Sequence, residues 1–306
     1  MSRGRILAVA AAAGLLLAAP VLPAAADGLT QFKEALRQAP HGVLSYESGK
    51  PLGDNGFILE RVTVKPPPEA TDGVKTEPIH IDRITVEDFD FAAYNRDEAP
   101  NFAKLRAEGI SIDTKSFDAF DLRELTGRDT VKADFQLDYR VDPERRTMTL
   151  NRLELDLREL ARIELSLALE GINPNDRDPA ESASLRTASI VFEDRTLLGT
   201  ALPAAARASG IDPEKVVNLA EEILDSLRPG QGAATIAVLD ALAGYVDDYM
   251  QPKGPLRITL NPPGNIPLAA LAEIKDPEDA LKRLGLVVSY AGARAPSGAG
   301  RENPAR

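Results

Sequence analysis

Strict alternation of apolar and polar residues marks the chain between Val131 and Leu169. The odd-numbered positions from Val131 to Val141 are apolar, and the even-numbered positions between them are charged or polar. Because successive side chains of a strand point to opposite faces, this pattern predicts a strand with one apolar and one charged face. Similar runs follow at Thr147–Leu157 and Ile163–Leu169. Together they predict a long antiparallel β-meander.

The apolar phase of the predicted strands shifts in two places. One shift falls near Glu87 and Asp88, and the other near Asn151 and Arg152. A shift by one residue moves all later side chains to the other face unless the strand carries an extra residue. We therefore predict a β-bulge at each of these places.

The other periodicities place strands mainly in the first two thirds of the chain and helices mainly after Thr196. A broad apolar stripe marks the helix that begins at Asp212 and Pro213, an N-cap residue followed by proline. The predicted strands are 43–46, 57–64, 79–91, 110–116, 117–125, 185–193, 256–260 and 286–290, and the predicted helices are 30–38, 100–108, 197–209, 213–228, 233–250, 267–273 and 277–284.

This order of elements predicts an α+β fold, with a long bulged antiparallel meander whose apolar face is covered by the C-terminal helices. Residues 27–290 are predicted to form one domain, strand-rich over 43–194 and helix-rich over 196–290. Residues 291–306 are rich in Gly, Pro, Ser and Ala, which predicts a disordered tail.

The N-terminus has the three parts of a secretory signal. Arg3 and Arg5 precede an uncharged apolar run over 6–19, and Ala24-Ala25-Ala26 provides small residues for cleavage. The run is shorter than the roughly 20 residues that a membrane span needs. We therefore predict a signal peptide over residues 1–26, cleavage near Ala26, export, and a mature protein that is not an integral membrane protein. The alternative is an uncleaved anchor.

Composition narrows the classes of partner. The net charge is −11, so an anionic nucleic acid is not an expected partner. The absence of Cys excludes disulfides, thiol nucleophiles and thiolate metal sites. The absence of Trp and the scarcity of other aromatics weaken the case for sugar or base stacking.

Candidate chemistry is sparse. The two histidines are His41, in a predicted loop, and His80, which alternates with apolar residues of a strand. His41 has no partner by spacing, and His80 shares a strand face with Asp82, which is the pattern of a polar pair on a solvated sheet face. No phosphate-binding loop or zinc motif occurs. The loop 173–178 contains oxygen ligands of the kind that calcium prefers, but it lacks EF-hand spacing. We predict a protein that is not an enzyme and holds no cofactor or metal.

The apolar face of the meander remains as the candidate binding surface. It could hold a lipid or protein partner, or the helices could bury it as an ordinary core, because both roles favour Leu, Val and Ile. The candidate residues are Phe135, Leu137, Tyr139, Leu153, Leu155, Leu165 and Leu167.

Two stretches resemble a known group of proteins. They are "FQLDYRVDPERRTMTLNRLELDL" (135–157) and "ASIVFEDRTLLGTALPAAARASGIDPEKV" (188–216). Their layout is similar to that of exported envelope proteins of Gram-negative bacteria with a YdgA-like layout, over about residues 131–290. The resemblance implies a periplasmic protein and carries over no active-site residue.

The leading hypothesis is a non-enzymatic protein of the periplasm that binds an envelope protein or a lipid through the apolar face of its sheet. The alternative is a periplasmic hydrolase that uses a pair of carboxylates. Glu154 and Asp156 are examples of such acids, but both belong to the charged face of a predicted strand, where solvated carboxylates are the expected content.

Overall fold

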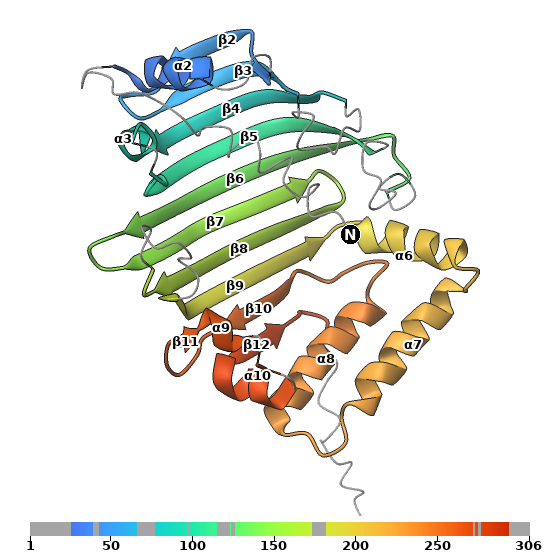
Figure 1. Ribbon diagram of the computed structural model, residues 1–306. Helices are drawn as coiled ribbons and strands as arrows, with labels where there is room; N and C mark the ends of the chain where they lie inside the picture. Colours follow the sequence, from blue (N-terminus) through green and yellow to red (C-terminus); the bar gives the residue numbers. More distant parts are fainter. Residues whose placement is uncertain are drawn as a thin grey trace, which may run out of the picture.

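The computed structural model describes residues 26–38, 43–65, 77–96, 98–114, 123, 126–172, 182–271, 273–274 and 277–293. Over these residues the chain is an α+β protein built on one antiparallel sheet, as the alternation predicted (Figure 1). The predicted signal peptide up to residue 25, the loop 173–178, His41, most of 117–125 and nearly all of the tail lie outside the described residues.

The sheet is a meander in which most neighbours in sequence are neighbours in space. Its main path is β1-β3-β4-β5-β6-β7-β8-β9-β10-β12, with β2 beside β3 and β11 beside β9. The strands are β1 (Leu44–Ser45), β2 (Ser48–Pro51), β3 (Phe57–Val64), β4 (Ile79–Phe89), β5 (Phe102–Asp113), β6 (Thr130–Asp142), β7 (Thr147–Leu157), β8 (Ala161–Glu170), β9 (Ser184–Asp194), β10 (Leu256–Leu260), β11 (Ile266–Pro267) and β12 (Leu286–Ser289).

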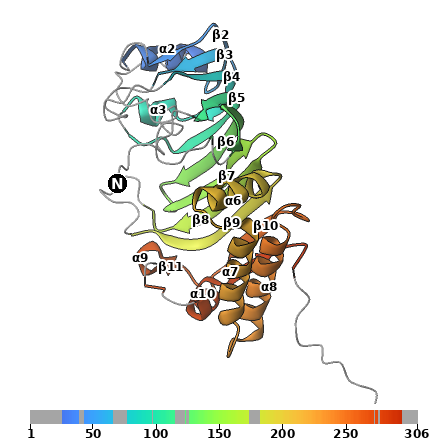
Figure 2. The same ribbon diagram turned by 90° about the vertical axis from the view of Figure 1, so that its right-hand side faces the viewer.

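Helices lie at the two ends of the sheet, and its middle strands run between them (Figure 1). They are α2 (Gly28–Gln38), α3 (Phe91–Tyr94), α6 (Leu197–Ala208), α7 (Pro213–Ser226), α8 (Ala233–Asp247), α9 (Leu268–Leu271) and α10 (Pro277–Leu284). Figure 2 shows the sheet from its side, with a marked twist from β2 to β10.

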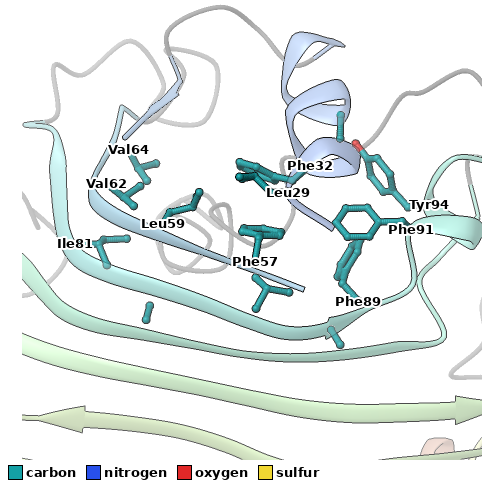
Figure 3. Packing of buried hydrophobic residues seen from close by; sticks show 14 of the residues in the cluster. Leu29, Phe32, Phe57, Leu59, Val62, Val64, Ile81, Phe89, Phe91 and Tyr94 are labelled. Atoms are coloured by element: carbon teal, nitrogen blue, oxygen red, sulfur yellow. The ribbon is translucent and has the colours of Figure 1, made fainter. Parts of the chain in front are cut away.

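The main hydrophobic core lies between α2, α3 and the first strands. Phe32 of α2 stacks on Phe57 of β3 with ring centroids 4.4 Å apart, and Phe89 and Phe91 meet edge to face at 4.9 Å (Figure 3). Leu59 is only 1% exposed. We call this group of buried residues the N-terminal core; its members include Leu29, Phe32, Phe57, Leu59, Val62, Val64, Ile81, Val86, Phe89, Phe91, Tyr94, Ala103, Ala107, Ile110 and Ala133.

Both predicted bulges are confirmed. The register between β4 and β5 shifts between Val86 and Asp88, and the register between β7 and β8 shifts between Leu150 and Leu153. Each extra residue restores the phase, so that apolar side chains stay on one face along the whole strand.

The predicted helix over 100–108 is wrong, because these residues belong to strand β5. The spacing of Phe102 and Leu105 suggested a helical face, and Gly109 suggested a helix stop. In the sheet, Ala103, Leu105 and Ala107 instead alternate as a strand requires, and Gly109 has φ +68° at a bulge.

The start of α7 confirms the predicted cap, and the start of α6 has a cap that was not predicted from the sequence. The carboxylate of Asp212 accepts a hydrogen bond from the Glu214 amide at 3.0 Å, with Pro213 at the first helical position of α7. At the start of α6, Asp194 accepts a bond from the Leu197 amide at 2.8 Å. These caps satisfy amides that have no partner within their helices.

The C-terminal helices cover the apolar face of the sheet only at its end. α8 and Leu198 of α6 pack on Phe192, Leu256 and Val288, which belong to β9, β10 and β12. α7 packs on α6 and α8, outside the sheet (Figure 1). The helices therefore leave the apolar face of the middle strands outside their contacts.

Two substitutions on one face of the sheet separate its buried part from its exposed part. Leu59→Ala removes a fully buried side chain, and we expect it to lower the free energy of unfolding by about 2–5 kcal/mol. Ile163→Ala removes a side chain that is 43% exposed, and we expect a loss of under about 1 kcal/mol. Urea denaturation followed by circular dichroism measures both. Equal losses would mean that Ile163 is buried in solution.

Candidate functional site

The candidate site lies on the apolar face of strands β6 to β9, where apolar side chains form rows across the strands. In the central row, Leu137 of β6 lies opposite Leu153 of β7, Leu153 opposite Leu165 of β8, and Leu165 opposite Ile190 of β9. Antiparallel register makes such a row possible, because side chains of opposed residues share a face. The row continues through Ile258 of β10.

All of the predicted face residues lie on this one face. Phe135 and Leu155 oppose each other in a second row, and Tyr139 and Leu167 both oppose Leu150 in a third. The structure divides the set in two. Phe135, Tyr139 and Leu155 pack against the N-terminal core. Leu137, Leu153, Leu165 and Leu167 lie beyond it and are partly exposed.

Two isoleucines on the same face are the most exposed of its apolar residues. Ile163 of β8 is 43% exposed and Ile190 of β9 is 38% exposed. Neither was among the predicted face residues, although the alternation of their strands could have identified both. We define the open apolar face as Leu137, Leu153, Ile163, Leu165, Leu167 and Ile190.

The open apolar face is bounded at one end by the N-terminal core and at the other by a cluster of aromatic rings. Tyr245 of α8 meets Phe192 at 6.2 Å and Tyr290 at 5.1 Å, both edge to face. Burial, and secondarily the charge of Asp194, raises the pKa of Tyr245 far above its ordinary value. The two ends of the face are thus closed by packed side chains.

Asp194 links the aromatic cluster to helix α6. Its carboxylate is buried, and burial raises its pKa, while hydrogen bonds from the Leu198 and Leu197 amides oppose that shift. A carboxylate that caps a helix start is favoured by the partial positive charge there. This acid therefore has a structural role at the C-terminal boundary of the open face.

The opposite face of the sheet is a ladder of charged side chains. Arg162 of β8 donates to Glu154 at 2.8 Å and to Glu164 at 2.9 Å, and Arg152 lies within 4 Å of both acids. Glu154 and Glu164 are cross-strand neighbours, and Glu154 is buried. The bond to Glu154 raises the pKa of Arg162.

This ladder bears on the alternative of a carboxylate hydrolase. Glu154 and Glu164 do come together, but Arg162 bonds both, and Asp156 is held by Arg195 at 2.7 Å. These three acids are therefore engaged in ion pairs with arginine side chains.

A second clamp on the charged face joins β5, β6 and the turn after β7. Arg158 donates to both oxygens of Asp134, at 2.8 and 2.7 Å, and Asp134 also accepts a bond from the Gly109 amide at 2.8 Å. The Arg158 bond holds the pKa of Asp134 below its usual range. The clamp fixes the bulge at Gly109, since this amide lies where the ladder between β5 and β6 is interrupted.

Of the remaining candidates from the sequence, the structure describes His80. His80 is exposed on the sheet, 3.2 Å from the Thr63 hydroxyl. Within the described residues, no group of three or more His, Cys, Asp or Glu could hold a metal ion. The possible calcium loop 173–178 lies outside them. No helix in the described part of the chain is long and apolar enough to cross a membrane.

Comparison with known proteins adds one match. A family model described as "Uncharacterized protein" matches residues 154–291, from within β7 to just past β12. No curated protein matches the chain. The matched segment contains four of the six residues of the open apolar face (Ile163, Leu165, Leu167 and Ile190), together with the aromatic cluster and all of α6, α7 and α8.

The charged clamp predicts a pH-dependent contribution to stability. We expect Arg158→Met to cost about 1 kcal/mol or less at pH 7, because the arginine is nearly half exposed. Since the folded pKa of Asp134 is lowered, the gap between wild type and variant should persist above about pH 4 and disappear as the pH falls through the folded pKa. Urea unfolding from pH 7 to pH 2 measures it.

Arg145→Met is the matched control, because Arg145 pairs with Asp142 at 3.6 Å in an exposed turn and contributes little. A gap for Arg158→Met that stays constant down to pH 2 would contradict an electrostatic clamp. It would instead assign the loss to the packing of the arginine stem.

Proposed function

We propose that this chain is a non-enzymatic lipid-binding protein of the periplasm, and that the open apolar face holds an acyl chain. The observation that carries the proposal is the exposure of Ile163 and Ile190 in a face that is otherwise continuous with the core. Contiguous exposed apolar surface on a folded protein is typical of a binding site for a partner or a lipid.

The dimensions of the face support an acyl chain. Neighbouring strands are about 4.8 Å apart, so the central row of the open apolar face, from β6 to β9, extends about 14 Å across the strands. One leaflet of a bilayer is about half of a 30 Å hydrocarbon core, or about 15 Å. A single extended acyl chain therefore matches the row in length, lying across the strands and between the two closed ends.

The chemistry of the face favours a hydrocarbon over a protein surface. Its side chains are all Leu or Ile, and the backbone beneath them is engaged in the ladders of the sheet. Protein interfaces typically have aromatic residues and arginine at their centre and about one hydrogen bond per 100–200 Å². An acyl chain forms no hydrogen bonds, and burial of its surface against aliphatic side chains is enough to bind it.

The proposed location rests on the sequence. Residues 1–26 have the pattern of a cleavable signal, and the layout resembles that of Gram-negative exported proteins with a YdgA-like layout. A lipid that crosses the aqueous periplasm needs its hydrocarbon covered, and an exposed aliphatic face on a soluble sheet could provide that cover. The described part of the chain has no helix that could cross a membrane.

The test is binding of a fluorescent long-chain fatty acid, cis-parinaric acid, to the purified and delipidated chain. We expect saturable binding, displaced by unlabelled saturated fatty acids. Burial stabilises by about 0.8 kcal/mol per CH₂ group, so each shortening by two carbons should weaken displacement about tenfold. Ile163→Glu should weaken binding at least tenfold, because it places a carboxylate on the open apolar face, in the row beside the central one.

The matched control is Val287→Glu, because Val287 is 58% exposed and apolar but points to the opposite face of the sheet. It should bind as wild type does. Absence of binding by the delipidated wild type would overturn the proposal, and so would equal loss in the two variants. Binding that does not depend on chain length would indicate an electrostatic site elsewhere.

A further inference from the structure

Helix α7 has a second exposed apolar surface, which is separate from the open apolar face. Leu219 is 56% exposed and Ile223 is 53% exposed, and Ile211 and Leu227 are exposed as well. None of the residues of α7 is buried, although the neighbouring helix α8 buries many of its own. Four of the large apolar residues that the structure exposes thus lie within one short segment.

Lys215, Leu219 and Ile223 follow one ridge of the helix, each four residues from the next, and Lys215 is the polar member. Leu227 is the C-cap residue, whereas Ile211 precedes the N-cap Asp212 and lies outside the helix. Residues four apart lie on the same side of an α-helix. The inner side of α7, with Val217 and Leu224, is half-buried against its neighbours α6 and α8. The ridge therefore faces away from the rest of the molecule. Figure 1 shows α7 at the outer edge of the C-terminal helices, which agrees with this orientation.

The ridge is self-complementary about Leu219. In an antiparallel pair of α7 helices related by a twofold axis at Leu219, Leu219 meets its own copy. The same axis brings Lys215 of one copy beside Ile223 and Glu222 of the other. A twofold interface repeats each contact, so the pair contains two Lys215–Glu222 contacts of opposite charge.

We propose that two copies of this chain associate through α7 in this antiparallel arrangement. Lys215 and Glu222 are both exposed at the flank of the ridge, where a long side chain can reach across to the partner helix. In an antiparallel pair, the positive end of each helix dipole also lies beside the negative end of the other, which is favourable. Acidic residues outnumber basic ones along α7, which disfavours an anionic membrane surface as the occupant.

The interface is small. One helix ridge offers well under the 800 Å² or so per partner of a standard interface, so the dimer should dissociate in the micromolar range or above. The arrangement leaves the open apolar face free, since α7 does not pack on the middle strands. The dimer is therefore independent of the lipid-binding proposal.

Sedimentation equilibrium of the purified chain over a range of concentrations tests the proposal. Wild type should show a monomer–dimer equilibrium, and Leu219→Lys should raise the dissociation constant at least tenfold, because it places two ammonium groups together at the axis. Val287→Lys is the matched control, with an equally exposed apolar residue elsewhere, and should dimerise as wild type does.

A charge swap identifies the arrangement. Lys215→Glu and Glu222→Lys should each weaken the dimer about threefold to tenfold, because like charges then meet twice, and the double variant should restore the wild-type constant. A wild type that stays monomeric up to about 1 mM overturns the proposal. A dimer that survives Leu219→Lys, or one that the double swap does not restore, overturns it as well.

Discussion

The register of the antiparallel sheet is the constraint on which the rest of the structure depends. Because opposed residues share a face, the alternation in each strand places most of the apolar side chains in rows that run from β3 to β12. The bulges near Asp88 and Asn151 preserve these rows where the sequence slips by one residue. One face of the sheet is thus apolar from end to end, and the fold must cover it or expose it.

In the part of the chain that the structure describes, helices pack on this face at its two ends. α2 and α3 bury it over β3 to β5, and α6 and α8 pack on Phe192, Leu256 and Val288 of β9, β10 and β12. Burial of the Phe57 and Phe91 region provides the main core, and the charged clamps on the other face, such as Arg158 with Asp134, hold the strands in register. The middle strands are therefore ordered by their neighbours, while their apolar side chains stay accessible. That combination suits a rigid surface for a flexible hydrocarbon.

Local features of the chain could be predicted from the sequence, but the packing of distant elements could not. The alternation from Val131 onward determined which side chains share a face, and Asp212 with Pro213 marked the start of α7, since both are local effects. The helix predicted over 100–108 was wrong because the spacing of Phe102 and Leu105 fits either period over so short a stretch. The segment forms strand β5 because it pairs with β4 on one side and with β6 on the other.

The exposure of the candidate site also depends on how elements distant in the sequence pack together. Leu165 in the open face and Leu59 in the core have the same chemistry, and only the position of the helices distinguishes them. The outer ridge of α7 is similar: its apolar pattern was visible in the sequence, but its exposure follows from how α8 and α6 surround the helix. Sequence composition favours neither core nor binding surface, because both use the same residues.

Cysteine accessibility tests the central claim, that the apolar face of β6 to β9 is open, most directly. The chain has no cysteine of its own, so single substitutions can be labelled without background. Ile163→Cys and Leu59→Cys lie on the same face of the sheet, in β8 and β3. In the native protein, Ile163→Cys should react with a maleimide at a rate close to that of the exposed Thr149→Cys, while Leu59→Cys should react only on unfolding. Protection of Ile163→Cys to the level of Leu59→Cys would show that the face is sealed and would contradict the account.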